Sequence, residues 1–85
     1  MIDREIKTFI LRALHAANGS PMTDDSLKAA VRNAFAHVAF TANDLSDHVK
    51  GCEEANLIAG TNDEVFGVMW ALTPKGKIRA QSLPR

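Results

Sequence analysis

Apolar residues in the first part of the chain recur at the three- and four-residue spacing of helices. Over residues 3–17 they fall on one side of an amphipathic helix, opposite a polar side. A second helix is predicted over residues 24–35. Thr23 suits its N-cap position, and Asp24 and Asp25 would complement the positive end of the helix dipole. The pattern therefore predicts two amphipathic helices before the middle of the chain.

A third helix is predicted over residues 42–55, with Thr41 as its N-cap. Its inner stripe consists of three apolar residues at helical spacing: Leu45, Val49 and Cys52. Asn56 belongs to the residue types that adopt the left-handed conformation at a helix end. Between the first two helices, residues 20–23 could add a short extended piece whose Met22 points into the core.

After the third helix the pattern changes from helical to alternating. Two strands are predicted, at residues 57–60 and 65–73, on either side of a turn-prone stretch at 61–64. The second strand places alternate apolar residues on one face: Phe66, Val68, Trp70 and Leu72. Gly67 would weaken this strand or mark a bulge. A short helix is predicted over residues 74–81, with proline at its first position.

The composition indicates one small globular domain over residues 1–85, because 46% apolar and 24% charged residues are ordinary globular values, and the predicted helices and strands make it α+β. The single Cys52 cannot form an internal disulfide, which favours a reducing, cytoplasmic location. The N-terminal residues lack the apolar stretch of a signal peptide. No apolar run approaches the ~20 residues that a spanning helix needs, so we expect no membrane partner.

Two sequence motifs and the order of the elements carry a resemblance to a known superfamily. "CEEANLIAG" looks like the end of a recognition helix entering a strand, and "MWALTPKGKIRA" looks like a second strand feeding a final helix. From about residue 5 to residue 81, the chain resembles the winged helix-turn-helix superfamily, as in small bacterial or phage regulators. The resemblance implies a three-helix core, a two-stranded antiparallel wing hairpin and a short C-terminal helix. It also implies transcription regulation through DNA.

Charge is distributed unevenly along the chain, although the formal net charge is zero. Residues 1–43 carry +1 and residues 73–85 carry +4, whereas residues 44–72 set six acidic side chains against Lys50 alone, giving −5. The third helix and hairpin, which would be the DNA face of such a regulator, are therefore the acidic part of the chain. Because non-specific DNA affinity comes from neutralising phosphates, this charge opposes DNA binding through that face.

Two functions remain open, and both are binding functions. A DNA-associated regulator would use the polar and basic side chains of the third and last helices: Asn43, Ser46, Lys50, Lys75, Lys77 and Arg79. A protein-interaction module would instead dock a basic surface through the acidic side chains of the third helix and hairpin: Asp44, Asp47, Glu54, Asp63 and Glu64. A solvated surface is the simplest explanation for charged side chains in either set.

Other residues that could carry chemistry are better explained by packing. His48 and Cys52 lie four positions apart, but two ligands make no structural zinc site, and Cys52 belongs to the apolar stripe. Trp70 could stack on a partner, although its place beside apolar neighbours on a strand favours the core. No catalytic residue, metal ligand or cofactor is predicted, so we expect a protein that is not an enzyme.

One apolar side chain falls outside the helical stripe of the first segment. Leu11 lies on the outward side of the predicted helix, among polar residues. A single exposed leucine is ordinary. Together with Ile78 or Leu83 near the C-terminus, however, Leu11 could form a homodimer contact.

Overall fold

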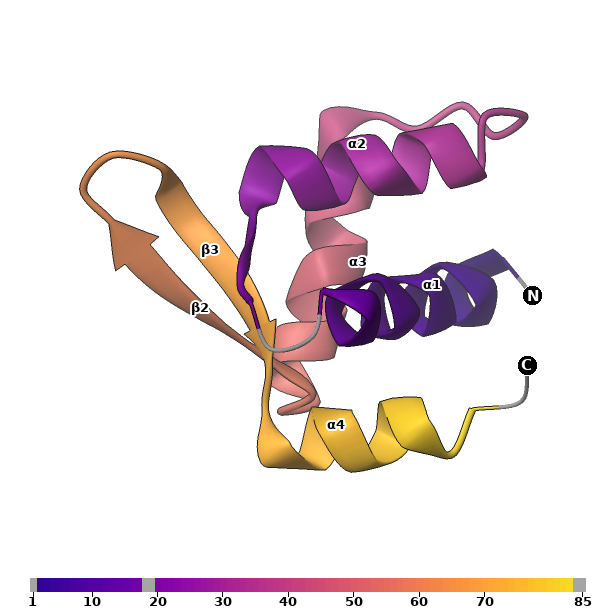
Figure 1. Ribbon diagram of the computed structural model, residues 1–85. Coiled ribbons are helices and arrows are strands. Elements are labelled where there is room, and N and C mark those ends of the chain that lie inside the picture. The colour runs from indigo at the N-terminus through magenta and orange to yellow at the C-terminus, as the bar shows by residue number, and fades with distance from the viewer. Residues whose placement is uncertain (1, 18–19, 84–85) are drawn as a thin grey trace.

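The structure, a computed structural model, describes residues 2–17 and 20–83. This part of the chain holds seven elements: α1 (Ile2–Ala16), β1 (Met22–Thr23), α2 (Asp24–Ala34), α3 (Ala42–Glu54), β2 (Ile58–Asp63), β3 (Gly67–Leu72) and α4 (Pro74–Gln81). The fold is α+β, as predicted. Figure 1 shows α2 and α4 on opposite sides of α1, and the β2–β3 hairpin projecting away from the helices. None of the described helices is long and apolar enough to cross a membrane.

Three of the helices begin at a threonine whose hydroxyl accepts a backbone N–H from the first turn. These threonines are Thr23, Thr41 and Thr73, with N···O distances of 3.0–3.1 Å. At Thr41 the cap is reciprocal, because its own N–H donates to the Asp44 carboxylate at 3.1 Å. The predicted caps at Thr23 and Thr41 are confirmed, and so is the left-handed Asn56 after α3, with φ of 61°.

The sheet contains one strand more than the two-stranded hairpin that we expected. Its order is β1–β3–β2, and both pairings are antiparallel. The extended piece predicted before α2 forms β1, in which Met22 lies opposite Trp70 and Thr23 lies opposite Met69. Met22 is half-buried and packs against the core. The link between α1 and α2 is therefore tied to one end of the hairpin, which we call its base.

The hairpin turn lies further along the chain than the sequence predicts. Residues 61–63, expected to turn, continue β2, and the chain reverses at residues 64–66 instead. β2 is exposed at every position after Ile58. Polar, turn-prone residues are tolerated there because this part of the strand has no buried face that would require apolar side chains. The predicted strand ranges of 57–60 and 65–73 are corrected accordingly.

Side chain and backbone together fix the new turn. The Asp63 carboxylate accepts hydrogen bonds from the N–H groups of Val65 at 2.8 Å and Phe66 at 3.0 Å. Gly67 follows with φ of +76°, a conformation that a residue without Cβ adopts readily. Val65 is 81% exposed and Phe66 is 64% exposed. We call these two side chains the apolar tip.

The core joins all four helices to the base of the hairpin. Leu11 belongs to this core: it is only 4% exposed, so the prediction that it points outward is wrong. The cause is α4, which packs along α1 and leaves that helix buried on more than one side (Figure 1). A homodimer contact through Leu11 is therefore excluded. Leu83 is also partly buried against the core, whereas Ile78 is 70% exposed.

Two glycines allow close approaches that a side chain would block. A Cβ at Gly60 would lie 2.9 Å from the ring of Trp70, its partner on the neighbouring strand. A Cβ at Gly76 would lie 1.9 Å from the carbonyl oxygen of Leu57, so α4 packs directly on the backbone that enters β2. Both contacts lie at the base of the hairpin. There the sheet, the end of α3 and the start of α4 are closely packed.

Candidate interaction surface of α3, the hairpin and α4

The outward side of α3 carries mixed charges, with acids in the majority. Asn43, Asp47, Lys50 and Glu54 are all exposed. Their spacing of three and four residues places them along one face of the helix. This face offers two carboxylates, one ammonium and one amide to a partner. The sequence prediction for these four positions therefore agrees with their exposure, while their ligand stays a matter of proposal.

Ser46 is turned toward α2 and does not stand free on the outward face. It is half-buried, and its hydroxyl accepts a hydrogen bond from Lys28 Nζ at 3.2 Å. Lys28 also forms an ion pair with Asp24, at 2.9 Å. Lys50 lines the same shallow groove, of about 200 Å³, between α2 and α3. Of the predicted DNA contacts on α3, Ser46 is thus already committed to a contact within the protein.

The groove continues to the sheet through Asp24. Its carboxylate accepts a hydrogen bond from the indole Nε1 of Trp70 at 2.9 Å. Partial burial disfavours the charged form of Asp24, but the hydrogen bonds from Trp70 and Lys28 outweigh it and lower the pKa of the carboxyl. Trp70 is 8% exposed, which confirms its place in the core. A stacking role for its ring is excluded.

The acids of α3 differ in how far they are available. Asp44 closes the capping box, and the hydrogen bonds from the Thr41 backbone and hydroxyl lower the pKa of its carboxyl. Asp47 is exposed and lines a shallow groove with Asp44, His48 and Lys7 of α1. A lysine therefore offsets part of the negative charge on this side of α3. Asp47 remains the more accessible carboxylate for a partner, because Asp44 already caps the helix.

The hairpin adds two acids and the apolar tip to this surface. Asp63 and Glu64 are both exposed. The N–H groups of Phe66 and Val65 lower the pKa of the Asp63 carboxyl, so this side chain keeps its charge while it holds the turn. The alternating pattern placed Phe66 within the second strand, on the face that it shares with Trp70, and did not predict the apolar tip. The exposure of Val65 and Phe66 follows from the turn at residues 64–66, so it could have been predicted only by placing the turn there.

The three predicted cations of α4 do not form one patch. Lys75 and Arg79 line a groove of about 620 Å³ between the end of α3 and α4, together with Leu57 and Ile78. Lys75 Nζ also donates to the carbonyl oxygen of Ala55 at 3.1 Å. The buried Gly76 and Ala80 form the inner side of α4 and separate this groove from Lys77.

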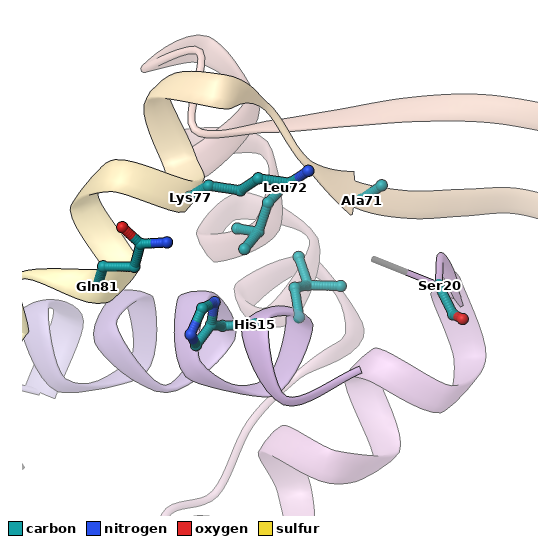
Figure 2. Close-up of a pocket in the computed structure, with 7 residues that line it drawn as sticks. His15, Ser20, Ala71, Leu72, Lys77 and Gln81 are labelled. Carbon is teal, nitrogen blue, oxygen red and sulfur yellow. The ribbon is translucent and has the colours of Figure 1, made fainter. Parts of the chain in front are cut away.

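Lys77 lies in a different pocket, between α4, α1 and the base of β3. This pocket has a volume of about 280 Å³ and is also lined by His15 and Gln81. Figure 2 shows the Lys77 side chain running past Leu72, while the Ser20 hydroxyl points away from the other side chains. Ser20 therefore does not join the other polar groups of the pocket. Lys77 thus shares no pocket with Lys75 and Arg79.

The His48–Cys52 pair shows no arrangement for chemistry. Cys52 is fully buried in the core, and burial raises the pKa of its thiol, although Lys7 lowers it in part. The His48 ring packs edge-on against Phe40, with 6.2 Å between ring centroids. Among residues 2–17 and 20–83, no three His, Cys, Asp or Glu side chains lie close enough to hold a metal ion. Cys52 is explained as a small buried apolar residue.

No family model matches the chain, and no curated protein is significantly similar to it in sequence.

Proposed function

We propose that the protein is a winged-helix domain that binds a basic protein surface through α3 and the hairpin. The order of the elements supports the architecture, with α1, α2 and α3 as a three-helix core, β2 and β3 as the wing and α4 as the closing helix. In this interpretation, β1 is a short addition at the base of the wing. The partner is proposed from charge and exposure.

One observation carries the proposed function: the side chains that α3 and the wing expose are acidic and apolar. Asp47, Glu54 and Glu64 are exposed, and residues 44–72 carry a formal charge of −5. The wing ends in Val65 and Phe66 and has no arginine or lysine at its turn that would neutralise DNA phosphates. A basic protein surface complements this charge, and the apolar tip can lose water on binding.

DNA association is the second candidate, and one observation favours it. Asn43 and Lys50 are both exposed, seven residues apart on the same face of α3, so they could reach base edges together. Ser46 is less suited than the sequence suggested, since it accepts a hydrogen bond from Lys28. Lys75 and Arg79 could hold a phosphate, but Lys77 lies in another pocket. Asp47 and Glu54 would face phosphates and repel them.

A DNA titration separates the two candidates. Fluorescence anisotropy of a labelled random duplex is measured from ~20 to ~200 mM salt, because the salt dependence of affinity counts phosphate contacts. The proposed function predicts no binding at the lowest salt. Binding with a clear salt dependence would establish DNA association instead. Lys50→Ala and Lys77→Ala would then show which face carries it.

The protein partner is tested by reversing charges on α3. The double variant Asp47→Lys with Glu54→Lys is compared with Glu5→Lys with Asp25→Lys, which alters net charge equally at exposed positions on α1 and α2. Proteins retained on the immobilised chain should be lost with the first pair and kept with the second. Each retained protein is then purified and titrated by calorimetry. A partner that binds the Asp47/Glu54 variant as tightly as the unmodified chain would refute the proposal.

A further inference from the structure

Two exposed apolar features lie away from the acidic outward face of α3. One is the apolar tip of the hairpin, Val65 and Phe66, which are 81% and 64% exposed. The other is the groove of about 620 Å³ between the end of α3 and α4, which we call the α3–α4 groove. Ile78, at 70% exposure, is a large apolar side chain on its wall. Exposed apolar side chains concentrated at one place indicate a contact surface.

The apolar tip is shaped for insertion. Its turn is held by the two hydrogen bonds from Val65 and Phe66 to the Asp63 carboxylate, at 2.8 and 3.0 Å. A turn that is fixed before binding loses little conformational entropy when it docks. Asp63 and Glu64, both exposed, add two carboxylates directly before these apolar side chains in the chain.

The α3–α4 groove has the opposite charge around the same kind of apolar surface. Leu57 and Ile78 contribute its apolar lining, and Lys75 and Arg79 contribute two cations. The groove is firmly built, because Lys75 is hydrogen-bonded to the Ala55 carbonyl and α4 packs on the Leu57 backbone at Gly76. An ammonium group has three N–H donors, so Lys75 can still meet a carboxylate.

The tip cannot fill the groove of its own molecule. Figure 1 shows the turn between β2 and β3 at the far end of the hairpin from α4, with the whole length of both strands between them. At its base, the hairpin is held pointing away from α4 by the pairing of β1 with β3 and by the Trp70–Asp24 hydrogen bond. Any tip that occupies the groove must therefore belong to another molecule.

We propose that a second copy of this chain occupies the α3–α4 groove with its apolar tip. Val65 and Phe66 would meet Leu57 and Ile78. Asp63 and Glu64 would face Lys75 and Arg79. Both sign and polarity match, and every copy carries one tip and one groove. The contact uses neither Asp47 nor Glu54, although it shares the hairpin tip with the surface proposed above to bind a basic protein. It joins two different patches, so it closes a ring or pair if the rotation allows and otherwise extends into a chain of copies.

Sedimentation velocity of the full chain tests the contact. We expect the chain to self-associate at protein concentrations between ~10 µM and ~1 mM, because contacts that bury less than about 1,200 Å² are weak. Phe66→Ser in the tip and Ile78→Ser in the groove should each weaken it by about tenfold or more. Both side chains are exposed, so unchanged circular dichroism and thermal unfolding should show that the fold is kept. Asp47→Lys, outside both patches, should associate like the unmodified chain.

Mixing the two variants gives the sharpest result. The Phe66→Ser chain keeps its groove and the Ile78→Ser chain keeps its tip, so an equal mixture should form pairs that neither variant forms alone. The charge reversals Glu64→Lys and Arg79→Glu should behave in the same way, as each alone repels and the mixture restores attraction. Rising salt should weaken association of the unmodified chain.

Three results would overturn the proposal. The first is an unmodified chain that stays monomeric throughout the concentration range. The second is a mixture of Phe66→Ser and Ile78→Ser that stays monomeric although the unmodified chain associates, since that mixture contains both an intact tip and an intact groove. The third is association that Asp47→Lys removes while Phe66→Ser leaves it intact. That outcome would assign self-association to the α3 surface, whereas loss of partner binding alone would concern only the proposed function.

Discussion

The base and the tip of the hairpin are built from the same two strands, yet they form different kinds of surface. At the base, Trp70 is 8% exposed, packs across Gly60 and is hydrogen-bonded to Asp24 of α2. At the tip, Phe66 belongs to the same alternating series as Trp70 but is 64% exposed. The difference comes from coverage: α1, α2 and β1 pack on the base of β3. Alternation assigns a side chain to a face, and the neighbouring elements decide whether that face is buried.

The largest effect should come from truncating the aromatic side chain at each end. Trp70→Ala should lower the free energy of unfolding by about 3–5 kcal/mol, because it leaves a cavity and removes the hydrogen bond to Asp24. Phe66→Ala should change it by no more than about 0.5 kcal/mol, as for an exposed side chain. Urea unfolding of both variants measures the difference. Similar losses at the two positions would remove the distinction between base and tip.

Replacing a glycine by alanine should give a smaller difference in stability between the base and the tip of the hairpin. Gly76→Ala should destabilise the protein by about 2–3 kcal/mol, since the new Cβ would overlap the Leu57 carbonyl and force α4 to move. Gly67→Ala meets no atom within 4 Å, so its cost should be the left-handed backbone alone, about 1 kcal/mol. Thermal unfolding of the two variants should keep this order. A larger loss from Gly67→Ala would show that the turn, and not the α4 contact, limits stability.

The smallest difference between base and tip should appear in how acid lowers stability through Asp24 and Asp63. The pKa values of Asp24 and Asp63 are both lowered from 3.8, so folding favours their charged forms. They stabilise the protein above pH 3.8, and this contribution is lost as the pH falls below 3.8 through the folded-state pKa. Asparagine at either position keeps a hydrogen-bond acceptor but does not titrate there.

The loss of stability in acid should therefore be smaller in Asp24→Asn and Asp63→Asn than in the unmodified chain. The reduction should be larger for Asp24 at the half-buried base than for Asp63 at the exposed tip, where solvent screens the charge. Unfolding in urea on both sides of pH 3.8 tests this order. Equal acid sensitivity of all three proteins would contradict it.

Local features of the fold could be predicted from the sequence, because the groups involved are neighbours along the chain. The caps at Thr23 and Thr41 join residues three positions apart. Leu11 was misplaced because a helical projection assumes one packing partner, whereas α1 packs against α2, α3 and α4. The turn differs from its predicted position because polar residues indicate a turn only when the adjoining strand has a buried face and must be apolar. The outer part of β2 has no buried face, so its polar residues 61–63 continue the strand.

The charge of the candidate surface could be predicted from the sequence, but the hydrogen bonds between its elements could not. The exposure of Asp47, Lys50 and Glu54 follows from helical spacing against the apolar stripe of α3. Two hydrogen bonds could not be predicted, because they join residues 18 and 46 positions apart: Lys28 with Ser46, and Asp24 with Trp70. Their geometry depends on how α2 packs against α3 and the sheet. Spacing along the chain carries no signal of that packing.

The Trp70–Asp24 hydrogen bond also makes the protein its own optical reporter. The chain contains one tryptophan and no tyrosine, so ultraviolet emission near the base of the hairpin comes from a single indole. That indole is shielded from water and donates its N–H to a carboxylate on α2. Separation of α2 from the sheet would expose the ring and shift its emission to longer wavelength, while movement of the distant tip would leave the colour unchanged. Unlabelled protein can thus reveal whether a bound partner disturbs the base of the hairpin.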